Sequence, residues 1–303
     1  MTVTTAAVGC SDGGRTDAGE TGLRKALARV AATDQLRDYV EYADGEGIAV
    51  VAGRTGAPEG PWRRLRGYEG GKIAAYSRTL ADVTGIELGA VRYRIAAGAP
   101  PYDVALLVGG QDAGQITGRL RASGWQDGAN GELTAPSLDA SGAPDVRVLS
   151  LSLAKVKPTG ADLAHGSADA SLDPVLAPGE KTLAADAGTV ALADCLGDVI
   201  VALMTRTKDT GEGPDAVAVG VRRTADKASA PRAIVCSEWR SAGAADRAAG
   251  EQRDALASGP FADTYRNGKA ERAGGNLVRL EADTPDDAAA VLAGFLERRL
   301  PGM

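Results

Sequence analysis

The sequence predicts an α+β protein of two tandem ferredoxin-like (split βαβ) modules, each an antiparallel sheet with helices on one face. Two observations lead to this prediction. The chain has 303 residues, which is about twice the length of a typical domain. In each half, segments with alternating apolar residues and segments with helical spacing follow the order strand, helix, strand, strand, helix, strand. We therefore divide the chain into a signal remnant and flexible tether at 1–20, module one at 21–140, a linker at 141–160, and module two at 161–303.

Module one begins with a short helix over 23–30 and an alternating strand over 37–42. Apolar residues at helical spacing predict the next helix, over 72–83. A hairpin follows, and then a helix that starts from Asp112 as N-cap and ends before Gly124. The hairpin strands and the closing strand are expected at 91–97, 103–108 and 132–135.

Module two repeats this order with little residue identity, so the repeat depends on the order of the elements alone. Its first strand is expected at 162–165, and an apolar helical stripe extends from Leu192 to Leu203. A closing helix should start at Thr284 as N-cap and end at Arg298 and Arg299. Between them we expect a hairpin, an alanine-rich helix and a strand, at 216–221 with 233–237, at 241–257 and at 276–281.

Composition excludes several classes of function. Acidic residues outnumber basic ones by 40 to 34, a net charge of −6, which argues against nucleic acid as a partner. No apolar run is long enough for a transmembrane helix. Three cysteines far apart and one histidine do not form a metal-ligand pattern, so we expect no metal and no cofactor.

Cys195 and Cys236 are predicted to form a disulfide. In the predicted module two, Cys195 lies on the first helix and Cys236 on the third strand, and a helix packed on the sheet would bring them together. A disulfide fits an exported protein. The alternative is two buried free thiols, since unpaired cysteine is among the most buried residue types.

The start of the chain resembles a bacterial lipobox. Ala6-Ala7-Val8-Gly9-Cys10 is a small apolar run into a cysteine, followed by the polar, glycine-rich Ser11-Asp12-Gly13-Gly14. In lipoproteins this cysteine carries the lipid, so the resemblance implies lipidation of Cys10. The segment before it lacks the basic start and full apolar core of a signal peptide, so we infer that the sequence starts inside the signal. The alternative is an ordinary N-terminus with a chance cysteine.

Three further strings are similar to actinobacterial extracytoplasmic lipoproteins of unknown function, namely Tyr39-Val40-Glu41-Tyr42-Ala43-Asp44, Ala97-Gly98-Ala99-Pro100-Pro101 and Arg299-Leu300-Pro301-Gly302. The resemblance covers most of the chain, but none of the strings is chemically specific. It implies an extracytoplasmic protein anchored to the outer face of the cell membrane. It implies no activity.

Catalysis has little support in the sequence. His165 is the single histidine, and no Gly-x-Ser-x-Gly elbow surrounds Ser167. The string from Gly67 to Ile73 resembles a phosphate loop, but its spacing is one residue short and Ile73 replaces the hydroxyl that binds magnesium. An envelope serine hydrolase using Ser167 and His165 remains the alternative function.

We expect instead a lipid-anchored binding or scaffolding module for an envelope protein or polymer. The candidate interaction loop is basic and aromatic on an acidic protein, and tryptophan, tyrosine and arginine are enriched at interaction hot spots. Its residues are Trp62, Arg63, Arg64, Arg66 and Tyr68. In the alternative interpretation, Trp62 packs into module one and the arginines are solvated or paired with carboxylates.

Overall fold

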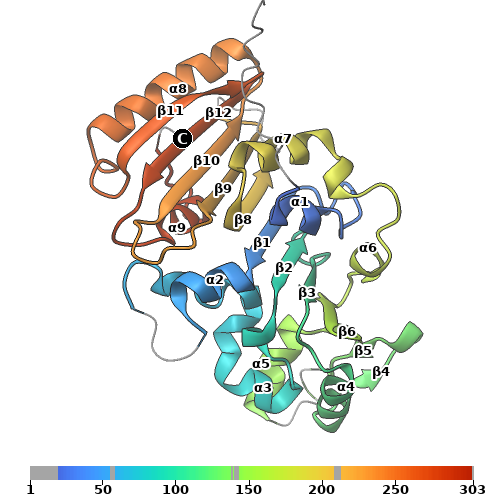
Figure 1. The fold of residues 1–303 in the computed structure, drawn as a ribbon. Coiled ribbons are helices and arrows are strands. Elements are labelled where there is room, and N and C mark those ends of the chain that lie inside the picture. The colour runs from blue at the N-terminus through green and yellow to red at the C-terminus, as the bar shows by residue number, and fades with distance from the viewer. Residues whose placement is uncertain (1–19, 55–58, 138, 140–142, 208–212, 302–303) are drawn as a thin grey trace, which may run out of the picture.

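The structure of the protein, a computed structural model, describes residues 20–54, 59–137, 139, 143–207 and 213–301. Within these ranges the chain combines helices with one antiparallel sheet of twelve strands (Figure 1). The strands are β1 (Tyr39–Asp44), β2 (Tyr93–Ala97), β3 (Val104–Val108), β4 (Gln126–Asp127), β5 (Leu133–Thr134), β6 (Lys155–Thr159), β7 (Asp162–Gly166), β8 (Val199–Arg206), β9 (Ala216–Arg222), β10 (Arg232–Glu238), β11 (Arg266–Gly274) and β12 (Leu277–Asp283).

The α-helices are α1 (Gly22–Leu27), α2 (Gly45–Ala52), α3 (Ser77–Thr84), α4 (Ala113–Ala122), α5 (Pro144–Ser152), α6 (Asp173–Leu176), α7 (Ala187–Leu196), α8 (Ala242–Ala257) and α9 (Ala290–Leu296). The described residues also contain five 3-10 segments: η1 (Arg63–Leu65), η2 (Tyr68–Tyr76), η3 (Leu88–Ala90), η4 (Ala129–Gly131) and η5 (Leu183–Ala185).

The two halves of the chain share the sheet. The strand order is β11-β12-β10-β9-β8-β1-β2-β3-β7-β6-β5-β4, and β1 pairs antiparallel with β8, with Tyr42 opposite Ala202. In a split βαβ sheet the first strand lies between the third and the fourth, whereas β1 lies between β2 and β8. The tandem ferredoxin-like arrangement is therefore not confirmed. The division of the chain into folding units stays a prediction.

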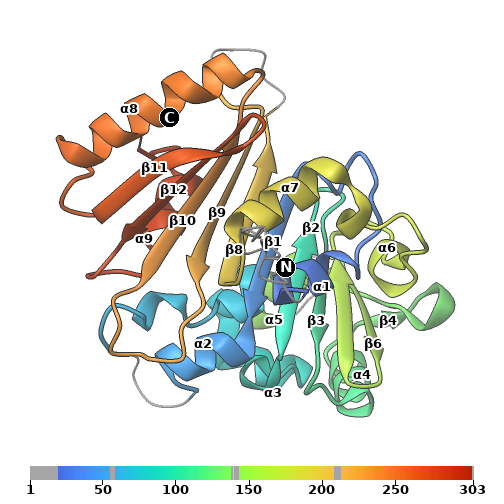
Figure 2. The ribbon, with the colours of Figure 1, turned by 45° about the horizontal axis from the view of Figure 1, so that its top comes forward.

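Helices cover both faces of the sheet, not one face as expected. On one face, α1, α6 and α7 pack on a core that includes Val40, Leu106 and Ile234. Figure 2 shows α1 and α7 in front of the strands on this side. On the other face, α2 and α9 pack over the β8–β9 region, and α3, α4 and α5 pack over β3, β6 and β7. These two groups of helices lie on the same face of the sheet. Ala43 in β1, Arg94 in β2 and Leu107 in β3 are directly opposite one another and therefore point to one face. Ala43 belongs to the core under α2 and α9, and Leu107 belongs to the core under α3, α4 and α5.

Local signals correctly predicted several elements. Asp112 caps α4 by accepting a hydrogen bond from the Gln115 amide at 2.9 Å, and Ser241 caps α8. The hairpins β2–β3 and β9–β10 are both present. These predictions succeeded because capping residues and turn residues act within a few positions of one another.

Two helix predictions are corrected. The helix expected to reach Leu203 ends at Leu196, because Gly197 has a φ of 72°, and the residues from Val199 to Arg206 form β8. The closing helix begins at Ala290 rather than near Thr284, whose hydroxyl donates to the Pro231 carbonyl at 3.4 Å. Strands β4, β6, β8 and β11 were not predicted.

The predicted disulfide is confirmed. Cys195, near the end of α7, is bonded to Cys236 in β10, and their Cα atoms are 6.1 Å apart. The helix lies over the strand as the prediction required, and both side chains are buried. The bond therefore joins the helical layer to the sheet.

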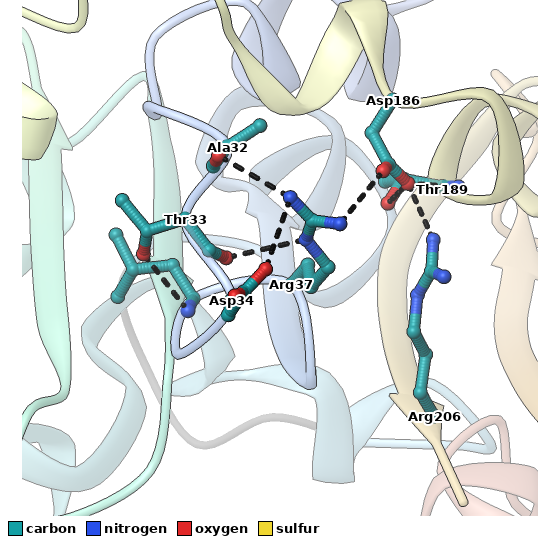
Figure 3. A network of polar contacts seen from close by, with 8 residues as sticks. Ala32, Thr33, Asp34, Arg37, Asp186, Thr189 and Arg206 are labelled. Carbon is teal, nitrogen blue, oxygen red and sulfur yellow. Dashed lines mark hydrogen bonds and ion pairs between the residues drawn. The ribbon is translucent and has the colours of Figure 1, made fainter.

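A polar network centred on Asp186 holds the start of α7 in place (Figure 3). The carboxylate caps the helix by accepting from the Thr189 amide at 2.9 Å and hydroxyl at 2.8 Å, and it pairs with Arg206 of β8 and with Arg37. Burial alone would raise the pKa of Asp186, but these hydrogen bonds and positive charges outweigh it and lower the pKa. The network ties the segment before β1 to α7 and β8.

The two outer strands of the sheet are irregular or short. The β11–β12 pairing shifts register between Arg266 and Lys269 and again between Arg272 and Gly274. At the opposite end, β4 has two residues.

Candidate functional site

A hollow of about 450 Å³ opens on the face of the sheet that carries α9 and η2. We call it the sheet pocket. Strands β1, β2 and β8 supply Tyr39, Glu41, Arg94 and Leu203 to its lining. The 3-10 segment η2 and helix α9 supply Tyr68, Gly71, Lys72, Ala74, Ala75 and Leu296. It lies near the middle of the sheet, where strands from both halves of the chain meet.

The floor of the pocket follows from the register of the strands. Glu41 lies opposite Leu203 on one side and Ala96 on the other, and Ala96 lies opposite Ala105. His165 follows next in the same row. Directly opposite residues share a face of the sheet, so two alanines separate Glu41 from His165. Their short side chains leave room on this face for the long side chain of Arg94.

Glu41 and Arg94 form a partly buried ion pair in this space. Arg94 Nη1 donates to Glu41 Oε2 at 2.6 Å, and the Arg94 side chain is only 5% exposed. The Tyr39 hydroxyl donates to Glu41 Oε1 at 2.9 Å. Burial alone would raise the pKa of Glu41, but the charge and hydrogen bond of Arg94 lower it, so the carboxylate is ionised at neutral pH.

Gly71 lies against the guanidinium of Arg94. Its φ is +53°, which favours glycine, and a Cβ at this position would come within 2.2 Å of Arg94 Cζ. Any larger residue would therefore displace the arginine or η2. The glycine allows η2 to close over the buried ion pair.

A second polar cluster adjoins the pocket. Lys72 pairs with Asp103, and the Ser167 hydroxyl also donates to Asp103. Burial alone would raise the pKa of Asp103, but the hydrogen bonds from Lys72 and Ser167 lower it. Both partners of Asp103 thus favour its charged form.

His165 is 1% exposed, and within the described part of the chain neither ring nitrogen makes a hydrogen bond of good geometry. Burial, reinforced by the charges of Arg94 and Lys72, outweighs a weak interaction with the Ser152 backbone and lowers the pKa of His165 to about 3, so the ring is neutral at physiological pH. Ser167 donates to Asp103 and not to His165. The structure does not assemble the pair that a Ser167–His165 hydrolase requires.

The candidate interaction loop divides into buried and exposed parts. Trp62 is 2% exposed, and its indole N–H donates to the Lys227 carbonyl at 3.0 Å, so this side chain is not available on the surface. Arg63 and Arg64 are exposed, and Arg64 pairs with Asp287 at 2.5 Å. Arg66 and Tyr68 line the sheet pocket. Two of the five loop residues therefore reach the site.

Glu41, Lys72 and Arg94 were not among the sequence-predicted site residues. A charge in the middle of β1, Glu41, and another within the otherwise apolar β2, Arg94, were the signal that could have found this pair. A buried strand rarely carries an unpaired charge, so opposite charges in neighbouring strands point to a pair.

A larger hollow, of about 990 Å³, lies beside α9 and the segment that follows α8. It is more open, and Arg64, Glu251 and Arg299 contribute charges of both signs at its surface. None of its lining charges is as deeply buried as Arg94. The sheet pocket is therefore the stronger candidate site.

The lipidation site, metal binding and membrane crossing were also considered from the sequence. Cys10 lies outside the described residues. Among the residues that are described, no cluster of histidine, cysteine and carboxylate side chains could hold a metal ion, and no helix is long and apolar enough to cross a membrane.

Comparison of the chain with models of known protein families gave no match, and comparisons with curated proteins and with solved structures gave none either.

Proposed function

We propose that the protein is a lipid-anchored binding protein of the cell envelope that takes its ligand into the sheet pocket. One observation carries the proposal: an ion pair between Arg94, whose side chain is 5% exposed, and Glu41, whose side chain is 27% exposed, lines an open hollow of about 450 Å³. Taking a guanidinium and most of a carboxylate out of water is costly, and ordinary packing needs no such pair. Perturbed charges in a concave site are typical of binding sites.

Filling the pocket tests this function. Ala75 is exposed and lines the pocket, so an Ala75→Trp variant should block the hollow without removing a charge. Ala122, at the end of α4, is also exposed but lies outside the pocket, so Ala122→Trp is the matched control. After incubation with envelope extract, native mass spectrometry should find a ligand on the wild type and on Ala122→Trp but not on Ala75→Trp.

Two results would contradict the proposal: a wild-type protein that captures nothing, or an Ala75→Trp variant that retains the same ligand. Circular dichroism of both variants should match the wild type, which shows that lost capture is not lost folding.

The place of action is also a proposal, and the lipobox-like residues around Cys10 support it. With a complete signal sequence placed before it, the protein should fractionate with membranes. More than one acyl chain on Cys10 is expected, because a single chain anchors weakly. A Cys10→Ala variant should appear in the soluble fraction. If it partitions with membranes as fully as the wild type, the anchor lies elsewhere.

A further inference from the structure

In the sheet pocket, the protein's own hydrogen bonds use a larger share of the acceptors than of the donors. Both oxygens of Glu41 already accept, Oε1 from Tyr39 and Oε2 from Arg94. The donors are not saturated: among the described residues Arg94 makes one side-chain hydrogen bond, from Nη1, and its Nε is buried without an acceptor. A guanidinium has five N–H donors. A carboxylate has about four acceptor sites and Glu41 uses two of them, so Arg94 leaves more donors unused than Glu41 leaves acceptors.

Two further donors face the same hollow. Lys72 carries three N–H donors, of which Asp103 takes one. A tyrosine hydroxyl is protonated at neutral pH and burial raises the pKa of Tyr68 further, so this hydroxyl can donate. A ligand that satisfies these groups must be rich in acceptors.

The net charge of the residues that line the pocket also favours a ligand rich in acceptors. Three cations, Arg66, Lys72 and Arg94, line the pocket with a single carboxylate, Glu41, although the whole chain has a net charge of −6. Asp103 offsets part of this excess through Lys72. A positive hollow on an acidic protein attracts anions and repels cations.

The remaining walls are apolar or aromatic. Leu203, Leu296, Ala74 and Ala75 line the pocket together with the tyrosines, and Leu296 is 60% exposed although it is a large apolar side chain. Such walls gain stability when a ligand removes them from water. A ligand that fits therefore combines an acceptor-rich group with an apolar or ring-shaped body.

We infer that the ligand of the sheet pocket carries an oxyanion, a carboxylate or a phosphate, on an apolar body, with Arg94 and Lys72 as its donors. This inference rests on the proposed function, because it names the ligand class of the same site. Two oxygens of a carboxylate or of a phosphate match the N–H donors of a guanidinium, and hydrogen bonds between charged groups are the strong ones.

Four probes of similar size test the ligand class by isothermal titration calorimetry with the whole chain: benzoate, phenyl phosphate, benzyl alcohol and benzylamine. Benzoate, phenyl phosphate or both should bind at least about tenfold more tightly than benzyl alcohol, the factor expected from one charged hydrogen bond. Benzylamine should bind no better than the alcohol. The first two probes also separate a carboxylate ligand from a phosphate ligand.

Matched variants locate the binding. Lys72→Gln should weaken binding of the preferred anion about tenfold, because it removes a charged donor from the pocket. Arg64→Gln removes a cation from the neighbouring loop and lies outside the pocket, so it should leave the affinity unchanged. Ala75→Trp should abolish binding of the anion.

The possible failures are distinguishable. Equal or tighter binding of the alcohol or the amine, or no anion binding up to about 10 mM, overturns the ligand class. If Ala75→Trp still blocks capture from envelope extract, the proposed function survives that result. If Ala75→Trp binds benzoate and phenyl phosphate as the wild type does, both the ligand class and the pocket are wrong.

Discussion

Replacing both Cys195 and Cys236 by alanine is expected to lower the free energy of unfolding by about 4 kcal/mol. The disulfide closes a loop with a sequence separation of 41, and the chain-entropy model gives about this value for such a loop. Loss of buried sulfur atoms adds a smaller cost, because Cys236 is fully buried. Thermal unfolding followed by circular dichroism should show a clearly lower melting temperature for the double variant.

Treatment with a reductant separates the effect of the disulfide on stability from the effect of side-chain packing. A reductant should lower the melting temperature of the wild type and leave that of the double alanine variant unchanged. Mass spectrometry of unreduced, alkylated protein should recover the two cysteine peptides linked. Two freely alkylated thiols in protein recovered from the envelope would show that the bond does not form there.

Lowering the pH from about 7.5 to about 5 is expected to reduce the free energy of unfolding by about 2 kcal/mol through His165 alone. Burial lowers the pKa of His165 from 6.5 to about 3 in the folded protein. Between these values the unfolded chain binds a proton that the folded protein does not. Stability is therefore fully present above pH 6.5 and falls, by at most about 1.4 kcal/mol per pH unit, until the pH reaches the folded pKa.

The single histidine makes this test clean. Carboxylates titrate mainly below about pH 5, so the upper part of the window isolates the ring. A His165→Leu variant keeps an apolar side chain of similar size, and its free energy of unfolding in urea should be nearly flat over the same range. An equally steep slope in this variant would assign the pH dependence to another group.

The sequence predicted those elements that depend on neighbouring residues. Asp112 before α4 and the turns inside the hairpins act locally, so a pattern of a few residues is enough. The disulfide was predicted because one helix packed on one sheet already brings Cys195 to Cys236. Neither prediction required knowledge of which strands pair across the molecule.

Predicting the single sheet that both halves of the chain share required knowing which strands pair. The run from Val199 to Met204 is apolar at every position because both faces of β8 are covered, and such a run matches a buried helix as well as a central strand. Because the predicted helix was extended over this run, the prediction lacked β8, the strand that joins the two halves of the chain. Strand β11 was missed for the opposite reason, since Ala270 is its single buried residue and no alternation is visible.

Arg66 and Tyr68 of the predicted interaction loop line the candidate site, and the role of that loop in binding stays a prediction. Glu41 and Arg94 were missed because a charge in a strand normally faces solvent, and here helices cover the face on which it lies. The pairing of β1 with β2 brings the two charges together.

The outer strands of the sheet also determine how readily copies of the protein aggregate. An open sheet edge offers unpaired backbone groups to any neighbouring chain and so invites aggregation. The register shifts in β11 and its exposed charged residues, such as Arg266 and Glu271, make that edge a poor template, and the two residues of β4 are too few to form one. The twelve-stranded sheet can thus exist in one molecule without pairing with a strand of another molecule.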